Sequence, residues 1–129
     1  MIDAERVDFI AVPTRDNERA ARFYGETLGL TRNPNSSEQW IEFETGNVTI
    51  ALLPHEFTGR SEFTPSSAPI ALRVADVSEA RRTLEAAGVE FQMDTIDSGV
   101  CFIAPFADPD GNSLLLHSRY APYADGTQP

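Results

Sequence analysis

The protein has 129 residues, the length of one ordinary domain and enough to bury a hydrophobic core. Its 20 acidic residues outnumber its 10 basic residues, which are all arginine, and the net charge is −10. A surface this acidic repels nucleic acid and anionic lipid, so we expect no nucleic acid and no membrane as partners. The simpler alternative is that the charge serves solubility alone.

A single cysteine, Cys101, lies in the apolar run at residues 100–103. One cysteine cannot form an intramolecular disulfide, which favours a cytoplasmic protein with a buried, inert thiol. No apolar run approaches the roughly 20 residues that span a bilayer.

The first predicted elements are a strand and a helix. Residues 7–12 form a short, largely apolar run, which is typical of a strand covered on both faces. Asp16 can accept hydrogen bonds from the free N–H groups at a helix start, and apolar residues then recur at helical spacing up to Leu28. Gly29 follows, where a left-handed residue commonly ends a helix.

Two strands and a long loop complete the first half. Residues 40–44 alternate in polarity, and residues 48–53 form a second strand after a turn at Gly46, so we expect a hairpin. Residues 54–68 are interrupted by proline, glycine and serine and predict a linking loop.

The second half begins with the same order of elements. Residues 70–74 predict a strand. Asp76 and Glu79 have the spacing of a capping box at the start of a helix, which ends at Gly88.

Two further strands are predicted near the end of the chain, at residues 100–104 and 112–117, joined by a turn at 108–111. The order strand, aspartate, helix, glycine therefore occurs twice, about 60 residues apart, which indicates two copies of one supersecondary unit. We expect a single domain over residues 1–129, divided into module one at 7–53, a linking loop at 54–68, module two at 69–118 and a polar tail at 119–129.

Several motifs at this spacing resemble one protein family. Asp16 with FYGETLGL at residues 23–30, and Asp76 with DPDGN at residues 108–112, resemble the vicinal oxygen chelate superfamily, which includes glyoxalase, bleomycin-resistance and dioxygenase proteins. The resemblance implies an α+β fold. In that fold two tandem βαβββ modules form a cup-shaped eight-stranded sheet with helices on its outer face.

Most members of that family hold a divalent metal with one residue from each of four strands. The positions that match here are Phe9, Ala51, Pro69 and Leu115. None of these side chains has a lone pair to give a cation, so we expect no metal and no other cofactor.

Side chains alternate between the two faces of a strand, so the same positions predict what lines the cup. With those positions facing inward, the cup is mostly apolar, and the outward set is uniformly apolar, as a helix-covered face should be. The expected ligand-binding residues are Phe9, Trp40, Ala51, Pro69, Arg73, Leu115 and His117.

Three of these residues have alternative roles. Arg73 can bind a substrate carboxylate or form a structural ion pair with Glu42 or Glu44. His117 is a weak candidate for a general base, and more often such a histidine is only hydrogen-bonded or solvated. Trp40 can stack on a flat or cationic ligand, or lie in the core or a dimer interface.

Other candidates lie in the loops. Phe57 and Phe63 form either a lid over the cup or a packing contact, and His55 is expected to be exposed. Asp108 and Asp110 are paired carboxylates, but their DPDG context makes them turn formers.

We therefore expect a glyoxalase/bleomycin-resistance-like homodimer that binds a small, cationic or aromatic molecule without metal. The first alternative is an enzyme of the lyase, isomerase or dioxygenase type, with a displaced metal site or with acid–base chemistry by His117 and Arg73. The second is an interaction domain whose cup is filled by its own side chains. The sequence favours a binding protein over an enzyme without deciding between them.

Overall fold

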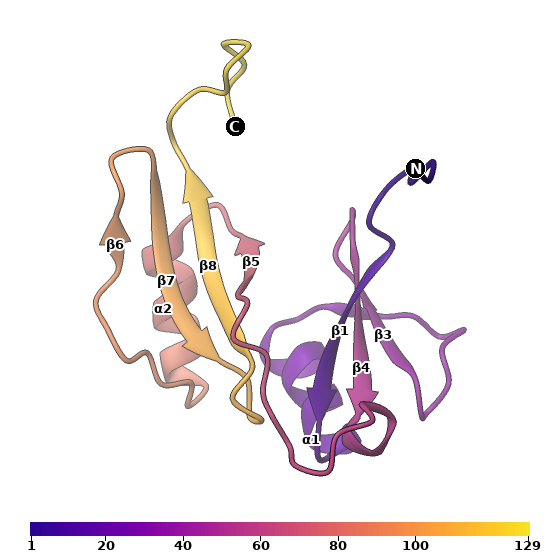
Figure 1. Ribbon diagram of the computed structural model, residues 1–129. Helices are drawn as coiled ribbons and strands as arrows, with labels where there is room; N and C mark the ends of the chain where they lie inside the picture. Colours follow the sequence, from indigo (N-terminus) through magenta and orange to yellow (C-terminus); the bar gives the residue numbers. More distant parts are fainter. The chain divides into compact units, whose positions relative to one another are not determined.

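The computed structural model describes all of residues 1–129. The chain divides into two compact units, Met1–Ser66 and Ser67–Pro129, and the boundary falls inside the expected linking loop. Each unit has one four-stranded mixed sheet and one α-helix (Figure 1). The α+β class and the eight strands are confirmed, with the strands hydrogen-bonded as two sheets of four rather than one sheet of eight.

The first sheet has the strand order β1-β4-β3-β2. Strand β1 runs parallel to β4, whereas β3 is antiparallel to both β4 and β2. The strands are β1 (Phe9–Thr14), β2 (Thr31–Arg32), β3 (Ile41–Glu44) and β4 (Thr49–Pro54). Strand β1 starts two residues later than expected, because its pairing with β4 begins at Phe9 and Thr49 and leaves Val7 exposed.

The helical segment of the first unit changes its winding halfway. Asp16 caps α1 (Asn17–Arg22) by accepting a hydrogen bond from the N–H of Arg19 at 3.0 Å, as predicted. A π-helical turn then covers Phe23–Thr27, so the expected regular helix is wrong over this stretch. The wider turn directs two adjacent rings, Phe23 and Tyr24, into the core.

The second sheet repeats the first, with the order β5-β8-β7-β6. Strand β5 is parallel to β8, and β7 is antiparallel to β8 and β6. The strands are β5 (Ile70–Arg73), β6 (Ile96–Asp97), β7 (Cys101–Ala107) and β8 (Ser113–Arg119).

Helix α2 (Val77–Ala86) lies against β7 and β8 (Figure 1). Asp76 caps it by accepting from the N–H of Glu79 at 2.9 Å, which confirms the predicted helix start. Val77 and Leu84 are its buried residues. A 3₁₀ turn, His55–Phe57, begins the linking loop of the first unit. No helix of the structure has the length and apolar character needed to cross a membrane.

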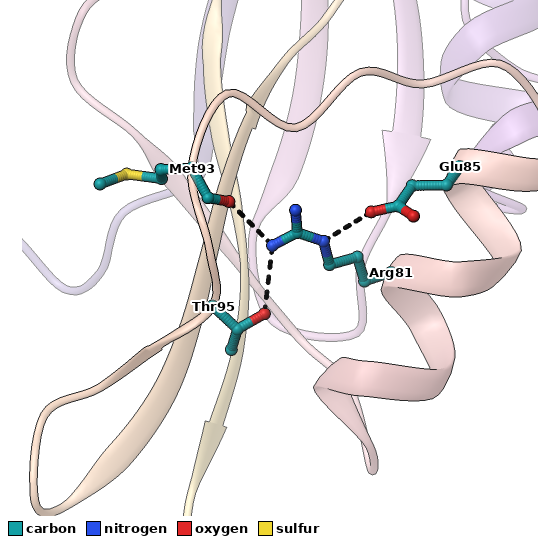
Figure 2. A network of polar contacts seen from close by, with 4 residues as sticks. All are labelled: Arg81, Glu85, Met93 and Thr95. Carbon is teal, nitrogen blue, oxygen red and sulfur yellow. Dashed lines mark hydrogen bonds and ion pairs between the residues drawn. The ribbon is translucent and has the colours of Figure 1, made fainter.

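Arg81 on α2 holds the segment that leads into β6 (Figure 2). Its Nε forms an ion pair with Glu85 at 2.6 Å, and its Nη1 donates to the carbonyl of Met93 at 2.9 Å and to the hydroxyl of Thr95 at 3.3 Å. The guanidinium also lies 4.6 Å from the ring centroid of Phe91. The Arg81 side chain therefore links α2 to residues 91–95, which form neither helix nor strand.

Burial confirms the predicted alternation of side chains. In each sheet, the side chains of one face are buried against the helix of that unit. These are chiefly Val12, Ile41, Phe43, Ile50 and Leu52 in the first sheet and Ala104, Phe106, Leu114 and Leu116 in the second. The opposite face of each sheet is called its helix-free face below.

Candidate functional site

The helix-free face of the first sheet combines aromatic and acidic side chains. The strand register places Phe9, Ala11 and Pro13 beside Thr49, Ala51 and Leu53, and Ala51 beside Glu42. Trp40 precedes β3, and its indole contacts the Phe9 ring edge to face, with the ring centroids 5.4 Å apart. Phe9 is 49% exposed and Trp40 is half-buried, so both rings present surface to solvent.

Two carboxylates border this ring pair. Glu42 Oε1 accepts a hydrogen bond from the indole Nε1 of Trp40 at 2.8 Å. Asn33 Nδ2 donates to Glu44 Oε1 at 3.1 Å and makes a longer contact with Glu42 Oε2 at 3.5 Å. The hydroxyl of Thr49 donates to Glu44 Oε2 at 3.3 Å. Every donor to these two carboxylates is a neutral group.

No basic residue of the four strands lies on this face. The only arginine in the four strands is Arg32, which pairs with Phe43 and therefore points to the opposite side. Glu42 and Glu44 thus retain two negative charges beside the ring pair of Phe9 and Trp40. Aromatic faces attract cations, and carboxylates bind ammonium and guanidinium groups, so this surface is suited to a planar cation.

The helix-free face of the second sheet has the opposite charge. It carries Arg73 on β5 and His117 and Arg119 on β8. Its other members are Ala71, Ser113, Leu115, Cys101, Ile103, Pro105, Ala107 and Ile96. No acidic residue belongs to this face.

The expected ligand-binding residues fall into both units. The first unit brings together Phe9, Trp40 and Ala51, although Ala51 is fully buried at 0% exposure. The second unit brings together Arg73, Leu115 and His117 on adjacent strands, and Pro69 is exposed just before β5. The expected partners of Arg73, which are Glu42 and Glu44, lie in the other unit.

Three residues of the first face were not predicted as site residues, namely Asn33, Glu42 and Glu44. The signal was present for the two glutamates, because Trp40, Glu42 and Glu44 alternate with Ile41 and Phe43 and must therefore share the side opposite the core.

The other candidate residues have structural surroundings. The ring of Phe63 lies 4.3 Å from the guanidinium carbon of Arg15 and 5.5 Å from the His55 ring, within the first unit. Phe57 is 60% exposed. Cys101 is buried, and its Sγ lies 3.0 Å from the Ser98 hydroxyl.

Asp108 and Asp110 form the turn between β7 and β8, as predicted. Asp108 Oδ1 accepts from the N–H groups of Asp110 and Asn112, both at 2.9 Å, and Oδ2 accepts from the side-chain amide of Asn112 at 2.8 Å. All three residues are buried.

The four positions at which the family places its metal ligands do not fit a metal. Phe9, Ala51, Pro69 and Leu115 have side chains without a donor atom for a cation. Nowhere do three or more histidine, cysteine, aspartate or glutamate side chains form a group that could hold a metal ion.

Comparisons with known proteins agree with this fold. The family model described as the Glyoxalase/Bleomycin resistance protein/Dioxygenase superfamily matches residues 6–116. No curated protein matches the chain.

Several solved structures share the fold. TnmS3, an antibiotic binding protein from Streptomyces sp. CB03234, is 25% identical with a TM-score of 0.74, and the match covers 92% of this chain and 99% of that chain. A member of the superfamily from Sphaerobacter thermophilus DSM 20745 is 25% identical with a TM-score of 0.74, covering 88% and 97%.

Lactoylglutathione lyase from Agrobacterium tumefaciens is 18% identical with a TM-score of 0.71, covering 89% of this chain and 94% of that chain. At this identity the likeness concerns the fold alone. Because the family model spans most of the sequence and the repeated βαβββ order agrees with it, the chain belongs to the glyoxalase/bleomycin resistance protein/dioxygenase superfamily.

Proposed function

We propose that this protein binds a small, planar organic cation on the helix-free face of its first sheet and does not transform it chemically. The observation that carries the proposal is the ring pair of Phe9 and Trp40 beside the carboxylates of Glu42 and Glu44, whose hydrogen-bond donors are all neutral.

The surroundings of the ring pair fit this role. A cation over an aromatic face gains about 0.5–1 kcal/mol at an exposed site, and a neighbouring carboxylate adds a charge-assisted contact. The hydrogen bond between Trp40 and Glu42 fixes the indole, so little freedom is lost when a ligand stacks on it. Apolar neighbours such as Ala11 and Leu53 supply the rest of the contact surface.

A relative supports a binding role rather than a reaction. TnmS3, at 25% identity, is named as an antibiotic binding protein. The acidic balance of the chain, with a net charge of −10, also favours attraction of cations.

The proposal includes a homodimer in the cytoplasm. Strands β1 and β5 are each hydrogen-bonded on one side only within their sheets, and unpaired strand edges favour further association. The free, buried Cys101 is compatible with a reducing compartment. Light scattering with size-exclusion chromatography tests the dimer, and a monomeric mass would contradict it.

Calorimetric titration with N-methylacridinium tests the binding proposal. The control ligand is acridine, which has the same shape, at a pH where it is uncharged. We expect the cation to bind and the neutral ring to bind far more weakly. Replacing both Glu42 and Glu44 by glutamine should reduce the affinity roughly tenfold, while the hydrogen bond from Trp40 keeps an acceptor.

The matched variant is Glu56→Gln, which removes a carboxylate from an exposed position in the 3₁₀ turn. It should leave the affinity unchanged. Equal binding of the two acridines, or an equal loss in Glu56→Gln, would contradict the proposal.

One observation favours an enzyme as the second candidate. The register places Arg73 beside His117, which allows metal-free acid–base chemistry of a lyase or isomerase type. A turnover that His117→Ala abolishes would support this candidate, whereas a stoichiometric metal in elemental analysis would favour an enzyme with a displaced metal site instead. If the protein shows neither ligand binding by calorimetry nor turnover, the remaining alternative is an interaction domain.

A further inference from the structure

The helix-free face of the second sheet is basic in a protein that is otherwise strongly acidic. Arg73, His117 and Arg119 belong to it, and none of the 20 acidic residues does. The helix-free face of the first sheet shows the reverse, with Glu42 and Glu44 and no arginine. The two copies of the repeat have therefore acquired opposite charge on equivalent faces.

Arg73 and His117 are direct neighbours on this face. They are register partners in the parallel pair of β5 and β8, whose strands lie about 4.8 Å apart, and partners in register share a face. His117 is also opposite Ile103 on β7, so the imidazole lies between the arginine and an apolar side chain.

Within the second unit, the side chains of Arg73 and His117 form no hydrogen bond or ion pair, and the carbonyl of His117 accepts from the backbone N–H of Val74. Two of the other three arginines of the second unit, Arg81 and Arg119, have partners, and the third, Arg82, is exposed on α2. Arg81 binds Glu85, and Arg119 donates to the carbonyls of Ala121 and Pro122, at 2.8 and 3.0 Å. Arg73 is exposed and His117 is half-buried, so both side chains have donors free for a ligand.

From this placement we infer that Arg73 and His117 form a binding site for an organic carboxylate on the second sheet. The planar guanidinium donates two parallel hydrogen bonds to a carboxylate, and the imidazole has an N–H donor in either protonation state. The half-buried side chains of Leu115, Ile103 and Pro105 adjoin the pair and provide an apolar surface for the body of the ligand. This site does not depend on the cation site proposed for the first sheet, so either can fail alone.

The chemistry favours an apolar carboxylate over an inorganic anion. A free phosphate or sulfate would use the two donors but gain nothing from the apolar neighbours. An aromatic carboxylate uses both the donors and the apolar neighbours. Its affinity should therefore depend on its carboxylate charge and on its ring.

Titration of the full-length, isotope-labelled protein with benzoate tests the inference by NMR. We expect saturable shifts of the Arg73 Nε–H and His117 ring resonances. Benzamide has the same ring without the charge and should cause no saturable shift. Arg73→Gln should weaken benzoate binding roughly tenfold or more, since charge-assisted hydrogen bonds are lost. Arg73→Lys keeps the charge but loses the planar fork, so we expect an intermediate loss.

Arg82→Gln is the matched control, because it removes the same charge from an exposed position on α2. It should leave the benzoate affinity unchanged. The inference is overturned if Arg82→Gln weakens binding as much as Arg73→Gln. Equal shifts with benzamide, or benzoate shifts that rise linearly without saturation, would overturn it as well.

Discussion

At the scale of single residues, Asp108 shows how one side chain can define a turn. Its carboxylate accepts three hydrogen bonds inside the tight connection from β7 to β8, at 2.8–2.9 Å, while the residue is buried. Without this carboxylate, the N–H groups of Asp110 and Asn112 and the side-chain amide of Asn112 would each lose an acceptor. The acidic residues of the DPDGN motif, Asp108 and Asp110, therefore have a structural role in this turn.

Replacing Asp108 by alanine should lower the free energy of unfolding by about 2–4 kcal/mol, because three buried hydrogen bonds to its carboxylate are lost. Asp108→Asn retains one acceptor oxygen and should lose less. Urea unfolding measures both. Pro109→Ala, at an exposed position of the same turn, is the control, and a loss in Asp108→Ala no larger than in this control would contradict the explanation.

The contact between Tyr120 and Asp97 predicts a pH dependence. The Tyr120 hydroxyl donates to Asp97 Oδ1 at 2.6 Å and, together with the N–H of Gly99, lowers the pKa of Asp97. The same hydrogen bond raises the pKa of Tyr120. The lowered carboxyl pKa means that this stabilisation is present above the usual aspartate range and is lost as the pH falls through the lowered value. The raised tyrosine pKa means that it is lost again as the pH rises through the raised value.

Titration of the Asp97 carboxyl by NMR checks this directly. In Tyr120→Phe the pKa should move up towards the ordinary aspartate value, with the part due to Gly99 retained. An unchanged pKa in this variant would show that the hydrogen bond does not form in solution.

At the scale of elements, the short strand β6 depends on side chains from outside it. It has only two residues, and Arg81 holds the segment before it through Met93 and Thr95 (Figure 2). The guanidinium also lies over Phe91, so its removal takes away packing as well as charge.

Arg81→Ala should therefore increase amide exchange over residues 91–97 and lower the free energy of unfolding by about 1–2 kcal/mol. Glu85→Ala removes only the partly exposed pair within the helix, which contributes about 0.3–0.5 kcal/mol. Hydrogen exchange followed by mass spectrometry separates the two variants. Similar exchange in both would mean that the ion pair, and not the tether, sets the stability of this segment.

The sequence predicted those helices and strands that are long enough to show a periodic pattern of apolar residues. Asp16 and Asp76 marked both helix starts, and strand alternation gave the buried faces. Strands β2 and β6 were missed because two residues show no periodicity. The π-helical turn was missed because its wider winding begins inside an apolar stripe that reads as regular helix.

At the scale of the whole molecule, the repeat in the sequence predicted two copies of one unit, and the motifs within it pointed to the family that the family model confirms. The site could be predicted only in part. Phe9 and Trp40 were expected to bind ligand, and they contact each other. Glu42 and Glu44 were considered only as ion-pair partners for Arg73, which was one of the two alternative roles of that arginine. The opposite charges of the two helix-free faces emerge only when the strand registers are known.

Binding of N-methylacridinium should be independent of divalent metal, because the four family positions offer no ligand atoms. Treatment with a chelator, or addition of zinc or manganese, is expected to leave the calorimetric affinity unchanged. A loss of binding after chelation would place a metal near the ligand.

The most direct measurement is the set of intermolecular NOEs between bound N-methylacridinium and the protein. We expect NOEs from the acridinium ring to the Phe9 ring and the Trp40 indole, and we expect them to weaken strongly in the Glu42→Gln, Glu44→Gln double variant at the same, subsaturating ligand concentration. Saturable binding with NOEs only to residues of the second sheet, or to neither sheet, would contradict it.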